Sequence, residues 1–192
     1  NLALSYTPFP AAVCGYLCPN LCMEACTRHT GFMAPLDVSQ LGKASIQAKT
    51  PVLPEKSGGK IAVIGGGPGG LSVAWQLNLA GYEAVVFDMA KTLGGKITSV
   101  IPESRMPKEV LDAELARINE VVPKIHLQQK LGREDFEKIR EDYDFVVIAT
   151  GTHKPRTLPV PGAERMVPAL DFLHQAKTGQ IKPGKQVVII GA

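Results

Sequence analysis

The sequence predicts an α/β protein whose central sheet is mainly parallel and covered by helices on both faces. Short apolar runs alternate along the chain with segments whose apolar residues recur at helical spacing. The apolar runs are continuous, as in residues 145–148 (FVVI), which is typical of strands buried on both faces of a parallel sheet. A glycine cluster at residues 65–70 directly follows the first run. Together these features indicate this architecture.

The expected elements follow one another in a regular order. Apolar spacing along one face supports the helices, for example Val110, Leu111, Leu115 and Ile118 in the longest of them. The expected helices are residues 71–79, 108–121 and 133–141, and the expected strands are 61–64, 84–87, 125–127 and 145–148. Ahead of them, residues 29–46 have a polar, helical pattern.

We expect four parts within the 192 residues. They are a helical cysteine-rich segment at 1–48, a Pro/Gly/Lys linker at 49–59, a dinucleotide-binding domain at 60–183, and the first strand of a further, truncated domain at 184–192. The last part repeats the entry into the main domain, because GKQVVIIG at 184–191 resembles GKIAVIG at 59–65. Two dinucleotide-binding domains in series would produce this echo, and a chance likeness of two strands is the alternative. Since the chain starts at Asn1 and ends on an apolar run, we expect an internal fragment.

Composition excludes several classes of protein. Hydrophobic residues make up 45% and charged residues 20%, which excludes a largely disordered chain. The 21 basic residues are interleaved with 18 acidic ones, so the net charge of +3 does not indicate a nucleic-acid partner. No apolar run reaches the roughly 20 residues of a membrane-spanning helix, and no secretory signal is recognisable. We therefore expect a cytoplasmic protein with neither nucleic-acid nor membrane partners.

The glycine cluster has the spacing GxGxxG, formed by Gly65, Gly67 and Gly70 between an expected strand and an expected helix. In a dinucleotide-binding turn, the first glycine permits the tight turn and the second lets the backbone approach a pyrophosphate. The third lets helix and strand pack closely. Pro68 suits the first helical turn, whose free N–H groups favour an anion. A purely structural glycine turn is the alternative.

Asp88 lies about 20 residues further on, where a carboxylate accepts the ribose hydroxyls of a bound dinucleotide. The alternative is a solvated residue at the end of a strand. The turn and Asp88 do not by themselves distinguish NAD from FAD.

Four cysteines, Cys14, Cys18, Cys22 and Cys26, occur at intervals of four residues near the start of the chain. In a chain without secretory features, such thiols favour metal or redox chemistry over disulfides. Their spacing leaves both zinc and iron–sulfur clusters open. A reductase like thioredoxin reductase would need a CxxC pair in the α/β part, and none occurs there.

Two further motifs narrow the assignment. A glycine pair in Leu93-Gly94-Gly95-Lys96, followed later by Ala149-Thr150-Gly151 at the end of a strand, resembles the FAD-containing flavoproteins with two dinucleotide-binding domains. The cysteine stretch at 7–28 and the GG…IPxxRxPK pattern at 94–108 are similar to one family among them. That family comprises the glutamate synthase small subunit and the N-terminal half of dihydropyrimidine dehydrogenase, and residues 170–173 (LDFL) also fit it. The resemblance spans nearly the whole chain.

This resemblance implies a Rossmann-like FAD-binding domain preceded by a small helical iron–sulfur segment. It implies that Asp88 binds the adenosine ribose, that Arg105 pairs with phosphate or polar flavin atoms, that Leu131 lies near the adenine and that Leu17 places the cysteine segment against the flavin. The residues that would hold or line the rest of the cofactor are Gly65, Gly67, Pro68, Gly69, Gly70, Gly94, Gly95, Lys96, Ala149, Thr150 and Gly151.

The same resemblance implies two 4Fe-4S clusters in the intact protein. Cys18 and Cys22 would serve one cluster and Cys26 the other, with further ligands from a region N-terminal to this chain, and Cys14 ranks below these three. NAD(P)H would bind a second glycine turn beginning at Gly191, and electrons would pass through FAD and the clusters to a partner subunit or domain. No catalytic side chain is indicated. A non-enzymatic cysteine-rich zinc module on a Rossmann-like scaffold is the alternative.

Overall fold

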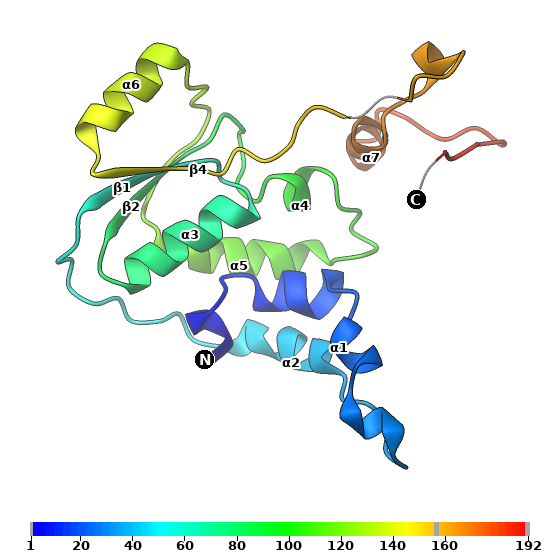
Figure 1. Ribbon diagram of the computed structural model, residues 1–192, viewed down its shortest axis with the longest axis horizontal. Coiled ribbons are helices and arrows are strands. Elements are labelled where there is room, and N and C mark those ends of the chain that lie inside the picture. The colour runs from blue at the N-terminus through cyan, green and yellow to red at the C-terminus, as the bar shows by residue number, and fades with distance from the viewer. Residues whose placement is uncertain (1, 156–157, 191–192) are drawn as a thin grey trace.

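The computed structural model of the chain describes residues 2–155 and 158–190, apart from the side chain of His29. Its centre is a four-stranded sheet with the order β3-β2-β1-β4, in which every neighbouring pair is parallel (Figure 1). The strands are β1 (Lys60–Ile64), β2 (Glu83–Phe87), β3 (Lys124–His126) and β4 (Phe145–Ile148). Since parallel neighbours need crossover connections, helices join successive strands. The mainly parallel sheet predicted from the sequence is confirmed.

Helices lie on both sides of this sheet (Figure 1). On one side, α3 (Pro68–Leu79) packs against β1 and β2, with α5 (Lys108–Val121) behind it. On the other side, α6 (Arg133–Asp142) contacts β4. The short α4 (Lys96–Ser99) and α7 (Ala169–Lys177) lie beyond the ends of the strands, as does the 3-10 turn Ala163–Arg165.

The strand β4 is less buried than the sequence predicts. Phe145 is 69% exposed and Ile148 is 66% exposed, although both belong to a continuous apolar run. The physical reason is position: among the described residues, β4 is an edge strand that pairs only with β1, and α6 covers little of it. The expectation of a strand buried on both faces is therefore wrong for β4, whereas the three central residues of β1 are buried.

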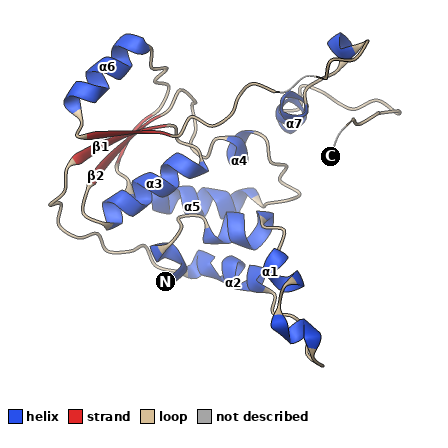
Figure 2. Cartoon of the chain, in the orientation of Figure 1, coloured by secondary structure: helices blue, strands red, loops and turns tan. Residues whose placement is uncertain are grey.

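In the part of the chain that the structure describes, the N-terminal segment contains helices and loops, and the strands belong to the following α/β part (Figure 2). It does not form a core of its own. Leu4, Phe9 and Ala12 are buried in the same hydrophobic cluster as Trp75 of α3 and Val86 of β2. The segment's elements are short: η1 (Leu2–Ser5), the π-helix η2 (Pro10–Leu17), α1 (Leu21–Glu24), η3 (Thr27–Thr30), α2 (Val38–Ala44) and η4 (Ser45–Gln47).

Most element boundaries agree with the sequence. The helix over 108–121 and the strand over 145–148 have the expected ends, and the other α/β elements differ by one to three residues. Helix α4 and helix α7 were not predicted, and the continuous helical pattern over 29–46 is broken, since α2 begins only at Val38.

The final residues show a further difference. The described residues 184–190 contain no strand, and Val187, Val188, Ile189 and Ile190 are all exposed. Apolar residues form a strand only where a neighbour accepts their backbone hydrogen bonds, and no other described strand lies beside them. Gly191 and Ala192 lie outside the described residues, so the predicted second glycine turn stays a prediction.

Within the described part of the chain, none of the helices combines the length and the apolar character that crossing a bilayer requires.

Candidate functional site

The glycine turn lies between the end of β1 and the start of α3, and two of its glycines are enclosed by backbone. Gly65 has a φ of +118°, and a Cβ added there would lie 2.3 Å from the carbonyl oxygen of Ala149. A Cβ added at Gly70 would lie 1.9 Å from the carbonyl oxygen of Gly65. No side chain fits in either place, so these two glycines allow strand β4, the turn and helix α3 to pack together.

The amino end of α3 is open by comparison. A Cβ added at Gly67 would come no closer than 4.0 Å to another atom, which is Cα of Gly95, and one added at Gly69 would have nothing within 4 Å. Pro68 occupies the first helical position, and the N–H groups of Gly69 and Gly70, in the first helical turn, have no hydrogen-bond partner within the helix. Free N–H groups, the helix dipole and empty space form a cradle that suits a phosphate group.

Asp88 follows β2 and lies beside this cradle. Its Oδ2 accepts a hydrogen bond from the Gly66 N–H at 2.5 Å, and its Oδ1 accepts one from the Ala90 N–H at 2.7 Å. The carboxylate is therefore held in a fixed orientation. Since its two oxygens offer about four acceptor sites, it can still accept hydrogen bonds from ribose hydroxyls.

The second glycine pair forms one wall of the cradle. The Gly94 N–H donates to the Gly66 carbonyl at 2.8 Å, which joins this loop to the glycine turn. Gly94 and Gly95 have φ values of +96° and +53°, in the left-handed region that favours glycine. A Cβ at Gly95 would lie 3.0 Å from the Gly67 Cα. The loop therefore approaches the turn as closely as two backbones allow.

The other wall is the chain after β4. The Ala149 N–H donates to the Ile64 carbonyl at 2.8 Å, so Ala149, Thr150 and Gly151 continue beside the end of β1. Lys96 connects the two walls: its Nζ donates to the carbonyl oxygen of Thr152 at 2.5 Å and lies 3.1 Å from Thr152 Oγ1. Thus the predicted residues of the turn and of both flanking loops come together at the carboxyl ends of β1, β2 and β4.

Three predicted cofactor residues are more loosely connected to this site. Arg105 is exposed, and its side chain makes no hydrogen bond or ion pair within the described residues. Leu131 is half-buried in the loop after β3, which approaches Asp88 because the Gln129 N–H donates to the Asp88 carbonyl at 2.8 Å. Leu17 ends η2 and packs against the shared hydrophobic core.

The cysteines do not converge. Cys14, Cys18 and Cys22 are free and exposed, and Cys26 is partly buried. In the part of the chain that the structure describes, no group of three or more His, Cys, Asp or Glu side chains is arranged to hold a metal ion. Partial burial raises the pKa of the Cys14 thiol, and the charges of Cys18 and Glu114 raise it further. Thiols are suitable donors for iron or zinc, but these four do not make a closed site.

Glu114 is a residue that sequence reasoning missed. It is fully buried on α5, and its two carboxylate oxygens accept hydrogen bonds from the Ala11 and Ala12 N–H groups at 2.7 and 3.0 Å. Burial raises its pKa to about 7, against the lowering effect of these two hydrogen bonds and of Arg117. Arg117 in turn donates to the Ile46 and Ala48 carbonyls, so α5 is bonded to the cysteine segment (residues 1–48) at η2 and again near residue 48.

A signal for Glu114 existed in the sequence. It follows Leu111 by three residues and precedes Ile118 by four, so a charged residue stands on the apolar face of a helix.

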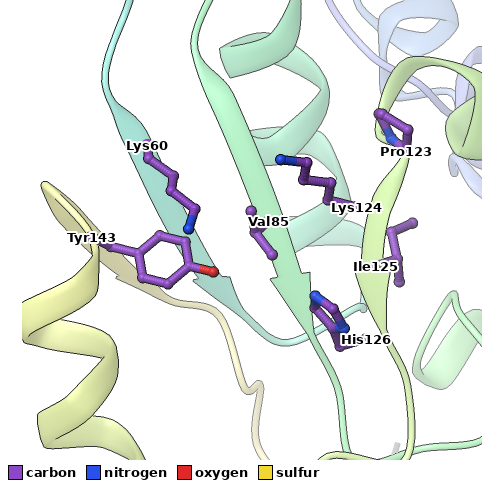
Figure 3. A pocket seen from close by; sticks show the side chains of 7 residues that line it. All are labelled: Lys60, Val85, Pro123, Lys124, Ile125, His126 and Tyr143. Atoms are coloured by element: carbon purple, nitrogen blue, oxygen red, sulfur yellow. The ribbon is translucent and has the colours of Figure 1, made fainter.

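A cavity of about 420 Å³ lies on the face of the sheet turned away from α3 (Figure 3), and its lining residues are Lys60, Val85, Pro123, Lys124, Ile125, His126 and Tyr143. It contains none of the predicted cofactor residues. The ammonium of Lys60 lies 4.3 Å from the centre of the Tyr143 ring, and Lys124 is paired with Glu83, so its charges are engaged within the chain.

Known proteins resemble this chain over most of its length. The family model described as pyridine nucleotide-disulphide oxidoreductase matches residues 59–192. The NAD-dependent dihydropyrimidine dehydrogenase subunit PreT of Escherichia coli (strain K12) is 31% identical, over 94% of this chain and 46% of that protein. Glutamate synthase (NADH) of Schizosaccharomyces pombe is 29% identical, over 92% of this chain and 9% of that protein. The chain thus spans about half the length of the first relative.

A solved structure, a 2-naphthoyl-CoA reductase in complex with 2-naphthoyl-CoA, matches 77% of this chain and 21% of that chain. The TM-score is 0.53 at 22% identity. This likeness supports the fold alone.

Proposed function

The chain belongs to the pyridine nucleotide-disulphide oxidoreductase family, and on this premise we propose that its cradle binds FAD. The observation that carries the proposal is the contrast within the glycine turn. Gly65 and Gly70 are enclosed by backbone, whereas Gly67 and Gly69 face open space beside free N–H groups. This arrangement suits a pyrophosphate, because the turn supplies N–H donors without side chains that would fill the space.

Different residues of the site would hold different parts of FAD. The N–H groups of Gly69 and Gly70 would donate to the pyrophosphate, with Pro68 fixing the first helical turn. Asp88, fixed by two backbone N–H groups, would accept hydrogen bonds from the ribose hydroxyls. Gly94 and Gly95 would let the cofactor approach the backbone, with Ala149, Thr150 and Gly151 opposite. We also propose Arg105, Leu131 and Leu17 as peripheral contacts.

We propose that the whole protein is an NAD(P)H-dependent oxidoreductase of the glutamate synthase small-subunit type. FAD, when bound, supplies the chemistry that converts hydride transfer into single-electron transfer, while the protein orients the flavin and tunes its reactivity. NAD(P)H would use the domain that begins near residue 184. The names of the relatives support this reading, since one is an NAD-dependent dehydrogenase subunit and another is an NADH-dependent synthase.

We propose that the cysteine segment serves 4Fe-4S clusters in the intact protein, through Cys18, Cys22 and Cys26, with Cys14 less favoured. The four thiols lie within one short segment that packs against the FAD domain, which supports an electron-transfer role. The ligand set within the described residues is incomplete. The zinc-module alternative is not favoured, because the family is one of oxidoreductases.

We further propose a partner subunit or domain as electron acceptor, and a cytoplasmic location. The relative PreT is itself named as a subunit. Exposed thiols such as Cys18 and Cys22 fit a reducing compartment.

The test is FAD binding by the chain and by its Gly67→Val variant. The first carbon of the new side chain fits, so the variant should fold, but the rest of the valine would occupy the cradle. We expect wild-type protein to bind FAD with a flavin absorbance spectrum, and the variant to show no detectable binding at an unchanged circular dichroism spectrum. Gly184→Val, in an exposed segment, is the matched control. Equal flavin content in Gly67→Val and wild type would overturn the proposal.

A further inference from the structure

The bridge between Lys96 and Thr152 spans the two loops that enclose the glycine turn. Lys96 comes directly after Gly95, whose Cα faces the open side of Gly67. Thr152 comes directly after Gly151, at the end of the chain segment that continues β4. No other side chain among the described residues joins these two loops by a hydrogen bond. The bridge therefore joins the two walls of the cradle.

The ammonium of Lys96 is only partly used. It has three N–H donors, and Thr152 takes two of them through its carbonyl and its hydroxyl. Lys96 makes no ion pair within the described residues, so its positive charge is not neutralised by a carboxylate. The third donor and the charge remain available to a bound anion.

The loop that carries Lys96 is fixed before any ligand arrives. Thr98 Oγ1 donates to the Leu93 carbonyl at 2.7 Å and Ser99 Oγ donates to the Gly95 carbonyl at 2.9 Å. The Gly94 N–H adds the bond to Gly66. Little conformational entropy is therefore lost when the lysine meets an anion, which makes its contribution to binding larger.

Resting on the proposed function, we infer that Lys96 and Thr152 form a clamp that retains the dinucleotide by donating a charge-assisted hydrogen bond to its pyrophosphate. Thr152 acts through Lys96, by holding the ammonium over the cradle. The neutral N–H donors of α3 position the phosphates, and the clamp provides the fixed cation that slows their release. Thr152 is thus a positioning residue for cofactor binding.

The test measures the dissociation rate of FAD, by the recovery of flavin fluorescence, in the full chain and in variants. We expect Lys96→Met to release FAD about tenfold faster, since a charge-assisted hydrogen bond is lost. Thr152→Val keeps the carbonyl acceptor and loses only the hydroxyl, so we expect a rise of about threefold. Lys96→Arg should keep most of the retention. Lys138→Met, which removes an exposed charge on α6, should match wild type.

A bridge that merely fastened the loops would behave differently. The proposed contact predicts that added NaCl accelerates FAD release more in wild type than in Lys96→Met, because only wild type has the ammonium to screen. Equal salt dependence, or equal release rates in wild type and Lys96→Met, would overturn the clamp while leaving FAD binding intact. Failure of wild type itself to bind FAD would overturn the clamp together with the proposed function.

Discussion

The glycine turn and the cysteine segment are built in opposite ways. The turn assembles its site from backbone: Gly65 and Gly70 pack against carbonyl oxygens, and the N–H groups at the start of α3 stay open. The cysteine segment is positioned by side chains: Phe9 lies in the core, and Glu114 is bonded to the first turn of η2. Within the described residues, however, its thiols do not come together as a metal site. The glycine turn thus forms a site from the backbone of residues close together, whereas the cysteine segment is held in a fixed position without forming a site.

This difference means that the position of the cysteine segment and the function of its thiols depend on different residues. The segment carrying Cys14 and Cys18 is held against α5 by contacts that involve no thiol. Variants that disturb the anchoring should change the stability of the whole chain, whereas variants at Gly67 and Gly69, the open positions of the turn, should change cofactor binding with little effect on stability.

The largest expected effect comes from Phe9→Ala. Phe9 is 1% exposed and belongs to the same core as Trp75 and Val86, so its truncation leaves a cavity between the two regions. We expect the free energy of unfolding to fall by about 3–5 kcal/mol in a single cooperative transition, measured by urea denaturation. Phe32→Ala, at a fully exposed phenylalanine, should change it by less than about 0.5 kcal/mol. Two separate unfolding transitions in wild type would break the comparison, because they would give the cysteine segment its own core.

The next largest expected effect is a dependence of folding stability on pH that comes from Glu114. Its pKa is about 7 in the folded protein, above the ordinary value of 4.5, so the folded state retains a proton that the unfolded state releases. The stability that this group contributes is fully present below about pH 4.5 and is lost as the pH rises through about 7. The loss across that window is about 3 kcal/mol.

The measurement is the unfolding free energy of wild type minus that of Glu114→Gln across this pH window. Glutamine does not titrate, so the difference should decline as the pH rises and then level off above about pH 8. The glutamine amide also places a donor against one of the two N–H groups, so the variant should be the less stable protein at pH 4.5. A difference that stays constant with pH would mean that Glu114 is ionised in the folded state at all these pH values.

Features that depend on residues close together in the sequence could be predicted, and features that depend on contacts between residues far apart in the sequence could not. The helix over 108–121 and the glycine turn follow from periodicity and spacing within about 20 residues. The role of Glu114 depends on Ala11 and Ala12, about 100 residues earlier, and no local pattern connects them. Exposure of Phe145 likewise depends on β4 being an edge strand, which its own residues do not reveal.

The smallest expected effect comes from Asp37→Ala at the start of α2. Asp37 caps this helix by accepting hydrogen bonds from the Ser39 N–H at 3.0 Å and from Gln40 Nε2 at 2.9 Å. Helix α2 packs so closely on η2 that a Cβ at Gly42 would lie 2.7 Å from the Gly15 nitrogen. Loss of the cap should lower the melting temperature by about 2–4 °C and loosen the support of the cysteine segment.

This variant separates the two regions most sharply, because α2 packs mainly on η2 of the cysteine segment. We expect faster labelling of Cys14 and Cys18 by a thiol reagent, since the helix that supports η2 frays more often. Affinity for FAD should be unchanged, because the turn is held by backbone contacts of its own. Asp37→Asn keeps an oxygen acceptor and should lie close to wild type in both measurements. Parallel loss of FAD affinity and thiol protection would show instead that the two regions respond as one unit.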